Sequence, residues 1–164
     1  MNKILQSTLP NEPKTKESVK AAYLYAGILV IFALGQLFTF DEFIKLLISF
    51  NFIGSPFTAK MAGGMFVVLE VFALPFLLQM RIPKYFRIAS MIFGILVPLG
   101  WLKISLWLSL TSNIVTNIGF VGTKIEIIPG WWTVSFSIAL VLLSAWACWG
   151  LWPIASKINI KNKK

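Results

Sequence analysis

Three polar side chains inside otherwise apolar segments are the residues of this sequence best placed to do chemistry: Gln36, Glu70 and Lys103. Ionisable groups are costly inside a membrane, so they normally have a partner or a function there. At a helical rise of about 1.5 Å per residue, Glu70 lies about 14 Å and Lys103 about 10 Å from the same membrane surface. Gln36 lies a few residues from that surface. We therefore predict one intramembrane polar cluster of Gln36, Glu70 and Lys103.

This cluster has two interpretations. In the first it is a structural salt bridge that fixes the register of packed helices. In the second it forms a proton path, or the polar end of a pocket for an apolar ligand such as a quinone. Lys103 could also extend its long aliphatic stem to the membrane surface and pair with nothing.

Other reactive groups are scarce. The chain has no histidine and a single cysteine, Cys148. The usual haem and zinc ligand is therefore missing, and no disulfide can form within the chain. We interpret Cys148 as a small apolar filler, with palmitoylation as the alternative. We expect no metal, no covalent cofactor and no catalytic residue that the sequence could name.

The elements that must position these residues are membrane helices. Hydrophobic residues make up 57% of the 164-residue chain and charged residues 13%. Apolar runs of about 20 residues match the thickness of the hydrocarbon layer. The sequence predicts an all-α transmembrane four-helix bundle with spans at 21–40, 61–80, 86–110 and 131–152. The flanks are a polar segment, 1–20, and a basic tail, 153–164.

The connections between the spans carry their own patterns. In residues 41–57, apolar residues recur at helical spacing, and charged residues share the opposite side. This pattern predicts a short interfacial helix after the first span. Gly54-Ser55-Pro56 indicates a turn. Gly63 and Gly64 give the second span a small face for close packing or for a dimer contact. Residues 111–130 contain β-branched residues and three glycines, which suggests a small hairpin.

The distribution of charge predicts the orientation. The formal net charge is +9, and the basic residues flank the apolar runs. Eleven Lys and Arg fall in the N-terminal segment, the second connection and the tail, against three in the other two connections. The positive-inside rule then places both termini in the cytoplasm. This distribution favours lipid over nucleic acid as the partner. We interpret most of the tryptophans as interface anchors: Trp107, Trp131 and Trp132 on the outer side, and Trp149 and Trp152 on the inner side.

The stretches FALGQLFTFDEFIKLL and GSPFTAKMAGGMFVVLEVFALPFLL carry a family resemblance. They resemble the first half of DoxX-like and MauE-like membrane proteins, and the likeness extends over residues 22–152. It implies a four-helix inner-membrane bundle linked to redox work. One branch is similar to the small membrane subunit of thiosulfate:quinone oxidoreductase, and another to proteins that help mature periplasmic disulfide-containing enzymes. Glu70 is the one position carried over. Gln36 departs from the family, whose members often have a basic residue shortly after the glycine that corresponds to Gly35.

The leading functional hypothesis is therefore a DoxX-like subunit that anchors or serves a redox complex linked to quinone. Any electron carrier would be a bound quinone or would reside on a partner subunit. A small proton-coupled transporter acting as an oligomer is the first alternative. Lys103 argues against it, because a fixed cation beside Glu70 would repel cationic cargo. A purely structural subunit of a larger membrane assembly is the second alternative.

Overall fold

Five helices and one short strand pair make up the computed structural model, which describes residues 7–10, 12–50, 55–111 and 115–152. The elements follow one another as β1 (Ser7–Thr8), α1 (Lys16–Phe38), α2 (Phe40–Ser49), α3 (Pro56–Leu77), β2 (Ile82–Pro83), α4 (Lys84–Leu110) and α5 (Trp131–Gly150). The predicted tail, 153–164, lies outside the described residues.

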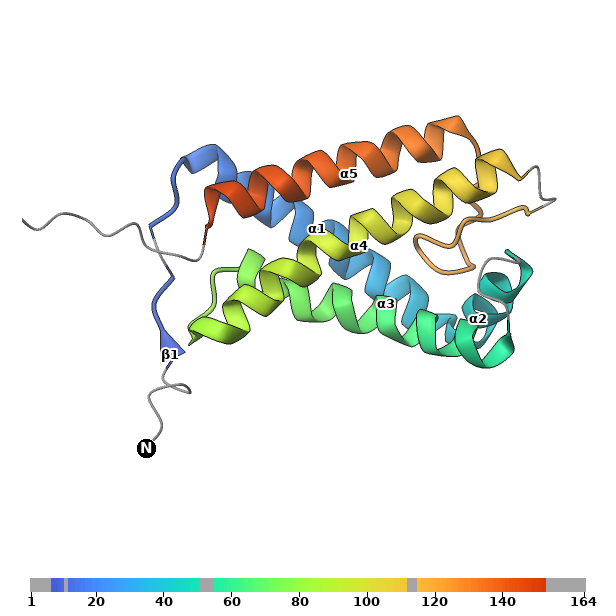
Figure 1. The fold of residues 1–164 in the computed structure, drawn as a ribbon, viewed down its shortest axis with the longest axis horizontal. Helices are drawn as coiled ribbons and strands as arrows, with labels where there is room; N and C mark the ends of the chain where they lie inside the picture. The colour runs from blue at the N-terminus through green and yellow to red at the C-terminus, as the bar shows by residue number, and fades with distance from the viewer. Residues whose placement is uncertain (1–6, 11, 51–54, 112–114, 153–164) are drawn as a thin grey trace, which may run out of the picture.

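The four long helices form a closed ring. α1 packs against α3 and α5, and α4 packs against the same two helices from the other side (Figure 1). All four are long and apolar enough to cross a membrane. Large apolar side chains are exposed on their outer faces, for example Ile31, Val68 and Leu142. In lipid this surface is solvated, so the chain is a multi-pass membrane protein built on a four-helix bundle.

Helix starts differ from the predicted span limits because capping residues set them. α1 begins at Lys16, where the Thr15 side chain accepts a hydrogen bond from the backbone of Ser18 at 3.1 Å. α3 begins at Pro56, five residues before the predicted span, because Ser55 is its N-cap. The predicted turn is therefore wrong at Ser55 and Pro56, which form the start of α3. Gly54 lies outside the described residues.

Prolines interrupt two of the membrane helices, and side chains from neighbouring helices form hydrogen bonds with the backbone near each proline. Pro98 has no N–H to donate to Gly94 four residues earlier. The Tyr25 hydroxyl donates to that Gly94 carbonyl at 2.6 Å. Near Pro75, the Ser90 hydroxyl accepts from the Phe76 N–H at 3.1 Å and donates to backbone oxygens of the preceding turn. These contacts tie α1 and α3 to α4.

The end of the bundle that holds the described chain ends is called here the terminal end. There β1 pairs antiparallel with β2, with Ser7 opposite Pro83. The buried Arg87 donates to the Leu9 carbonyl at 3.0 Å. The Lys14 N–H donates to the Gly150 carbonyl at 2.9 Å. The polar N-terminal segment is therefore strapped across the ends of α3, α4 and α5, which its sequence did not predict.

Replacing Arg87 with methionine should release this strap. The change keeps an unbranched apolar stem but removes the charged donors, each worth about 1.5–3 kcal/mol. We expect trypsin to cut after Lys14 and Lys16 at least about tenfold faster than in the wild type, because the strap is open more often. Arg81→Met is the matched control, since Arg81 is exposed. Equal cleavage rates in the two variants would refute the role of Arg87.

The opposite end, called the loop end, is closed by α2 and by the loop between α4 and α5. The described part of this loop, residues 115–130, contains no strand, so the predicted hairpin is wrong there. The reason is that the Asn117 side chain takes the backbone partners that a ladder would use. Its Oδ1 accepts from the N–H groups of Gly119 at 2.9 Å and Ile127 at 3.2 Å. The loop folds inward.

Candidate functional site

The centre of the loop half of the bundle holds a buried carboxyl group, that of Glu70 on α3. Its relative exposure is 0%, and that of Gln36 on α1 is also 0%. Gln36 Nε2 donates to Glu70 Oε1 at 3.1 Å, and Trp101 Nε1 on α4 donates to the same oxygen at 3.3 Å. Three helices thus meet at one carboxyl oxygen. We call Gln36, Glu70 and Trp101 the carboxyl site.

Helical periodicity explains why these side chains point inward. Glu70 lies three residues from the buried Val67 and three from the buried Ala73 on α3. Trp101 lies four residues after the buried Val97. The polar residues therefore occupy positions on the apolar inner faces of their helices, where the neighbouring helix supplies the partner.

Two polar atoms of the carboxyl site have no partner among the described residues. They are Gln36 Oε1 and Glu70 Oε2, both buried. Gln36 Nε2 also donates to the Phe120 carbonyl at 3.1 Å. Since a carboxyl oxygen and a carbonyl both accept here, the amide nitrogen of Gln36 must face them. The unpartnered amide atom is then the carbonyl oxygen, an acceptor.

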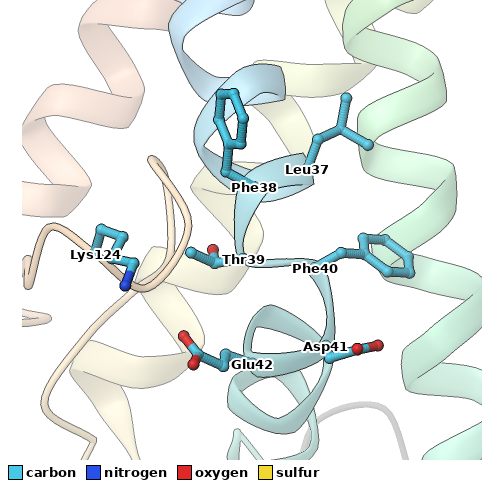
Figure 2. A pocket seen from close by; sticks show the side chains of 7 residues that line it. All are labelled: Leu37, Phe38, Thr39, Phe40, Asp41, Glu42 and Lys124. Atoms are coloured by element: carbon cyan, nitrogen blue, oxygen red, sulfur yellow. The ribbon is translucent and has the colours of Figure 1, made fainter.

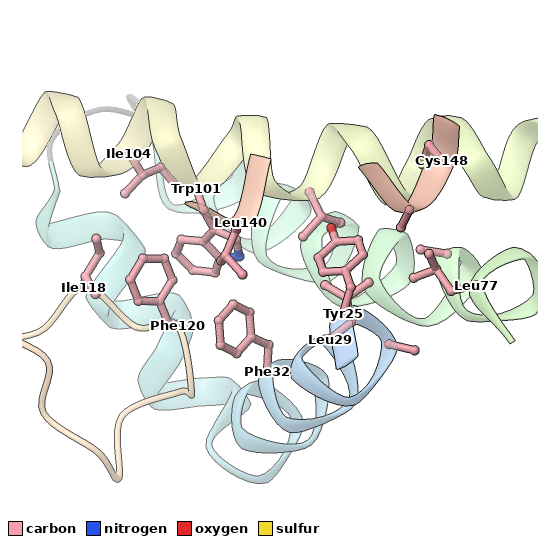
Figure 3. Close-up of a cluster of buried hydrophobic side chains, with 14 of the residues drawn as sticks. Tyr25, Leu29, Phe32, Leu77, Trp101, Ile104, Ile118, Phe120, Leu140 and Cys148 are labelled. Atoms are coloured by element: carbon pink, nitrogen blue, oxygen red, sulfur yellow. The ribbon is translucent and has the colours of Figure 1, made fainter. Parts of the chain in front are cut away.

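Aromatic rings enclose the carboxyl site. The Trp101 ring contacts those of Phe66 and Phe120, with centroids 4.9 Å apart in both pairs. Phe32 stacks on Phe120 at 5.5 Å, and Phe43 lies 6.4 Å from Trp101. Figure 3 shows Trp101, Phe32 and Phe120 gathered between α4, α1 and the loop. Such a shell excludes water and strengthens every electrostatic interaction inside it.

The α4–α5 loop covers this shell. Its Gly122 has a φ of 71° and lies against the Gly35 carbonyl, so a side chain at either glycine would clash. The Thr123 N–H donates to Thr39 Oγ1 at 3.1 Å, and the Thr123 hydroxyl donates to Glu42 Oε2 at 2.7 Å. The loop is thereby fastened to the α1–α2 junction, and Phe120 is held over the carboxyl site.

Lys103, the third residue of the predicted cluster, occupies a different face of α4. It is exposed, whereas Trp101 two residues earlier is buried and bonded to Glu70. Residues two apart on a helix point in nearly opposite directions. Counting residues along a helix gives the depth of a side chain but not its direction around the helix axis. The structure brings Gln36 and Glu70 together and places Lys103 on the lipid side.

Lys103 lines a groove of about 370 Å³ on the outer surface between α3 and α4. Its other lining residues are apolar: Ala62, Met65, Phe66, Leu69, Leu96, Leu99 and Gly100. Leu69 and Gly100 directly precede Glu70 and Trp101 in sequence, so the groove backs onto the carboxyl site. The Phe66 ring lies over Gly100 and touches Trp101 on its inner side. The Phe66 side chain therefore separates the groove from the carboxyl site.

A second pocket, of about 320 Å³, opens at the α1–α2 junction. Asp41, Glu42 and Lys124 line it together with Thr39 and neighbouring apolar residues. Figure 2 shows Glu42 and Lys124 beside Thr39, where the loop meets the junction. The exposed charges and the Thr123–Glu42 bond indicate a fastening point for the loop rather than a reaction site.

Trp101 and Phe120 are the site residues that the sequence did not reveal. The sequence interpretation assigned no role to Trp101, which lies nine residues before the end of α4, too deep for an interface anchor. The depth of Trp101 can be counted from the sequence, and it could have indicated a buried position. Phe120 sits in a polar connection, and its burial depends on the loop folding inward. Cys148 is buried in the apolar core, and Gly63 packs against Ile44 of α2.

Comparison with protein-family models, with curated protein sequences and with solved structures gives no significant match. The fold and the carboxyl site therefore define the class of this protein by themselves. It is a multi-pass membrane protein whose four-helix bundle encloses a buried carboxyl group.

Proposed function

We propose that this chain is a DoxX-like inner-membrane subunit that serves a redox complex by binding a quinone in the α3–α4 groove. The observation that carries the proposal is the groove itself. It faces the lipid, is apolar apart from Lys103, and backs onto the buried Glu70. A quinone has an apolar tail that lipid can deliver and a flat ring whose carbonyl oxygens accept hydrogen bonds.

The chemistry of the groove suits such a ligand. The Lys103 ammonium can donate to a quinone carbonyl, and the Phe66 ring offers an aromatic edge or face. The leucines of α3 and α4 would contact the tail. With no histidine and one cysteine, the chain has few ligands for a metal centre, so the electrons would come from a partner redox subunit. Glu70 would lie behind the quinone ring as a nearby polar group.

The proposed orientation has both termini in the cytoplasm. The terminal end carries Lys14, Lys16, Lys20, Arg81, Lys84 and Arg87. The loop end carries Lys45, Lys60 and Lys124. The excess of basic residues at the terminal end supports a cytoplasmic location under the positive-inside rule. The short amphipathic α2 would then lie in the outer interface, beneath the loop.

Purification in a mild detergent, followed by mass spectrometry of retained lipids and proteins, tests this function. We expect a bound quinone and a partner with a redox centre. A short-tailed quinone should bind the isolated chain saturably, and Lys103→Gln should weaken binding about tenfold or more, since a hydrogen bond to a charged group is worth about 1.5–3 kcal/mol. Lys45→Gln, on α2 and outside the groove, is the matched control. Absence of saturable binding would refute the quinone site.

One observation favours a second candidate, a proton-coupled transporter working as an oligomer. The cation that argued against it, Lys103, is exposed in the α3–α4 groove, and the described hydrogen-bond donors to Glu70 are neutral. A membrane carboxyl without that cation can bind a proton or a cationic substrate. A homo-oligomer that retains no quinone, and that carries protons into vesicles in a Glu70-dependent way, would favour this candidate over the first.

A further inference from the structure

The two unpartnered atoms of the carboxyl site need an explanation of their own. Gln36 Oε1 and Glu70 Oε2 are fully buried, and no donor reaches either of them from the described residues. A buried polar atom without a hydrogen bond costs about 1–3 kcal/mol, and native proteins rarely leave one, let alone two in one cluster. Both atoms are acceptors as long as Glu70 is ionised, so they cannot satisfy each other.

The two hydrogen-bond donors to Glu70 among the described residues, the Gln36 amide and the Trp101 indole, are both neutral. On α1 the Tyr25 hydroxyl is bonded to Gly94 O, and α5 carries no charged residue. The charged groups of α2, α3, α4 and the loop near this end are exposed: Asp41, Glu42, Lys45, Lys60, Lys103, Lys124 and Glu126.

We propose that Gln36 and Glu70 together form a proton-binding site inside the membrane. One proton on Glu70 Oε2 converts that atom into a donor, which bonds to Gln36 Oε1. The single proton thus satisfies both unpartnered atoms. It also removes a buried negative charge held only by neutral groups, the most expensive state for a carboxyl group in this environment. The result is a neutral acid–amide pair with hydrogen bonds in both directions.

This arrangement assigns a distinct task to each neighbour. Gln36 is the acceptor for the proton and donates back to Oε1, so it recognises the neutral acid on both of its oxygens. Trp101 donates to Oε1, the carbonyl oxygen of that acid. Phe120, whose carbonyl accepts from Gln36, fixes the amide in the required orientation. The proton site does not depend on the proposed quinone, and it can be examined in ligand-free protein.

Infrared spectroscopy tests the proposal directly. Of the six Asp and Glu side chains, Glu70 is buried, while Glu12, Glu17, Asp41, Glu42 and Glu126 are exposed. Exposed carboxyl groups are carboxylates at neutral pH. We therefore expect one protonated-acid carbonyl band at neutral pH in protein purified in a maltoside, a detergent without carbonyl groups. The band should shift in D₂O and on labelling glutamate with ¹³C at the side-chain carboxyl.

Variants assign the band and guard against misfolding. Glu70→Gln should abolish it, Gln36→Leu should move it to higher frequency because two hydrogen bonds are lost, and Glu17→Gln, at an exposed carboxyl group of the terminal end, should leave it unchanged. The measurement on folded wild-type protein is decisive even if a variant fails to fold. No acid band in labelled wild-type protein at neutral pH would mean an ionised Glu70, with another donor such as water on the two atoms, and would overturn the proposal.

Discussion

Replacing Trp101 with alanine is expected to lower the free energy of unfolding by about 3–5 kcal/mol, the range for removing a buried aromatic side chain. Trp101 is 0% exposed and contacts four phenylalanine rings. In a membrane, helices are held by packing and polar contacts rather than by the exclusion of water, so an unfilled space is the main cost. The change also removes one of the two hydrogen-bond donors to Glu70.

Thermal or detergent-induced unfolding of purified protein would measure this loss. Trp146→Ala is the matched control, because Trp146 lies on α5 and is 49% exposed to the lipid side. Trp101→Phe should lose less than Trp101→Ala, since a smaller ring still fills part of the space. Similar losses for the Trp101 and Trp146 alanine variants would show that the aromatic shell does not stabilise the bundle.

Replacing Gly122 with valine should detach the α4–α5 loop from the bundle. A β-branched residue at a φ of 71° is strained, and its side chain would collide with the Gly35 carbonyl and the Thr39 hydroxyl. We expect a cost of about 2 kcal/mol or more from the left-handed conformation and the collision together. The loop would lift, and Phe120 would leave its place over the carboxyl site.

Limited trypsin digestion can measure the detachment, because Lys124 lies two residues beyond Gly122 and is exposed. A cost of about 2 kcal/mol corresponds to roughly thirtyfold faster cleavage after Lys124 if cleavage follows the open population. Gly27→Ala is the control: nothing lies within 4 Å of an added methyl group there, and alanine favours a helix. Unchanged cleavage in Gly122→Val would mean that the loop is not held at this glycine.

Much of the fold could be predicted from the sequence because the membrane permits few backbone structures. Apolar runs long enough to cross the bilayer have to be helices, and the four predicted spans correspond to α1, α3, α4 and α5. The helix limits were less predictable, since they depend on caps such as Thr15 and Ser55. The strap at the terminal end and the inward fold of the α4–α5 loop depend on contacts between segments far apart in sequence, which no local pattern records.

The candidate site could be predicted only in part, for a related reason. Depth along a helix follows from counting residues, and it correctly suggested that Gln36 and Glu70 could meet, as their 3.1 Å hydrogen bond shows. Direction around a helix depends on which face packs inward, and depth alone could not separate Lys103 from Trp101. Phe120 reaches the site through a loop whose path is set by Asn117 and by glycines with positive φ.

The bond between the Lys14 N–H and the Gly150 carbonyl sets an order of events during biosynthesis. Gly150 ends the last helix, so the bond can form only after that helix has been synthesised and inserted. The β1–β2 pair, in contrast, needs only the chain up to Pro83. The N-terminal segment can therefore be captured first by the growing α3–α4 connection and joined to α5 last. Its final attachment marks a complete four-helix bundle, because a nascent chain of three spans cannot make it.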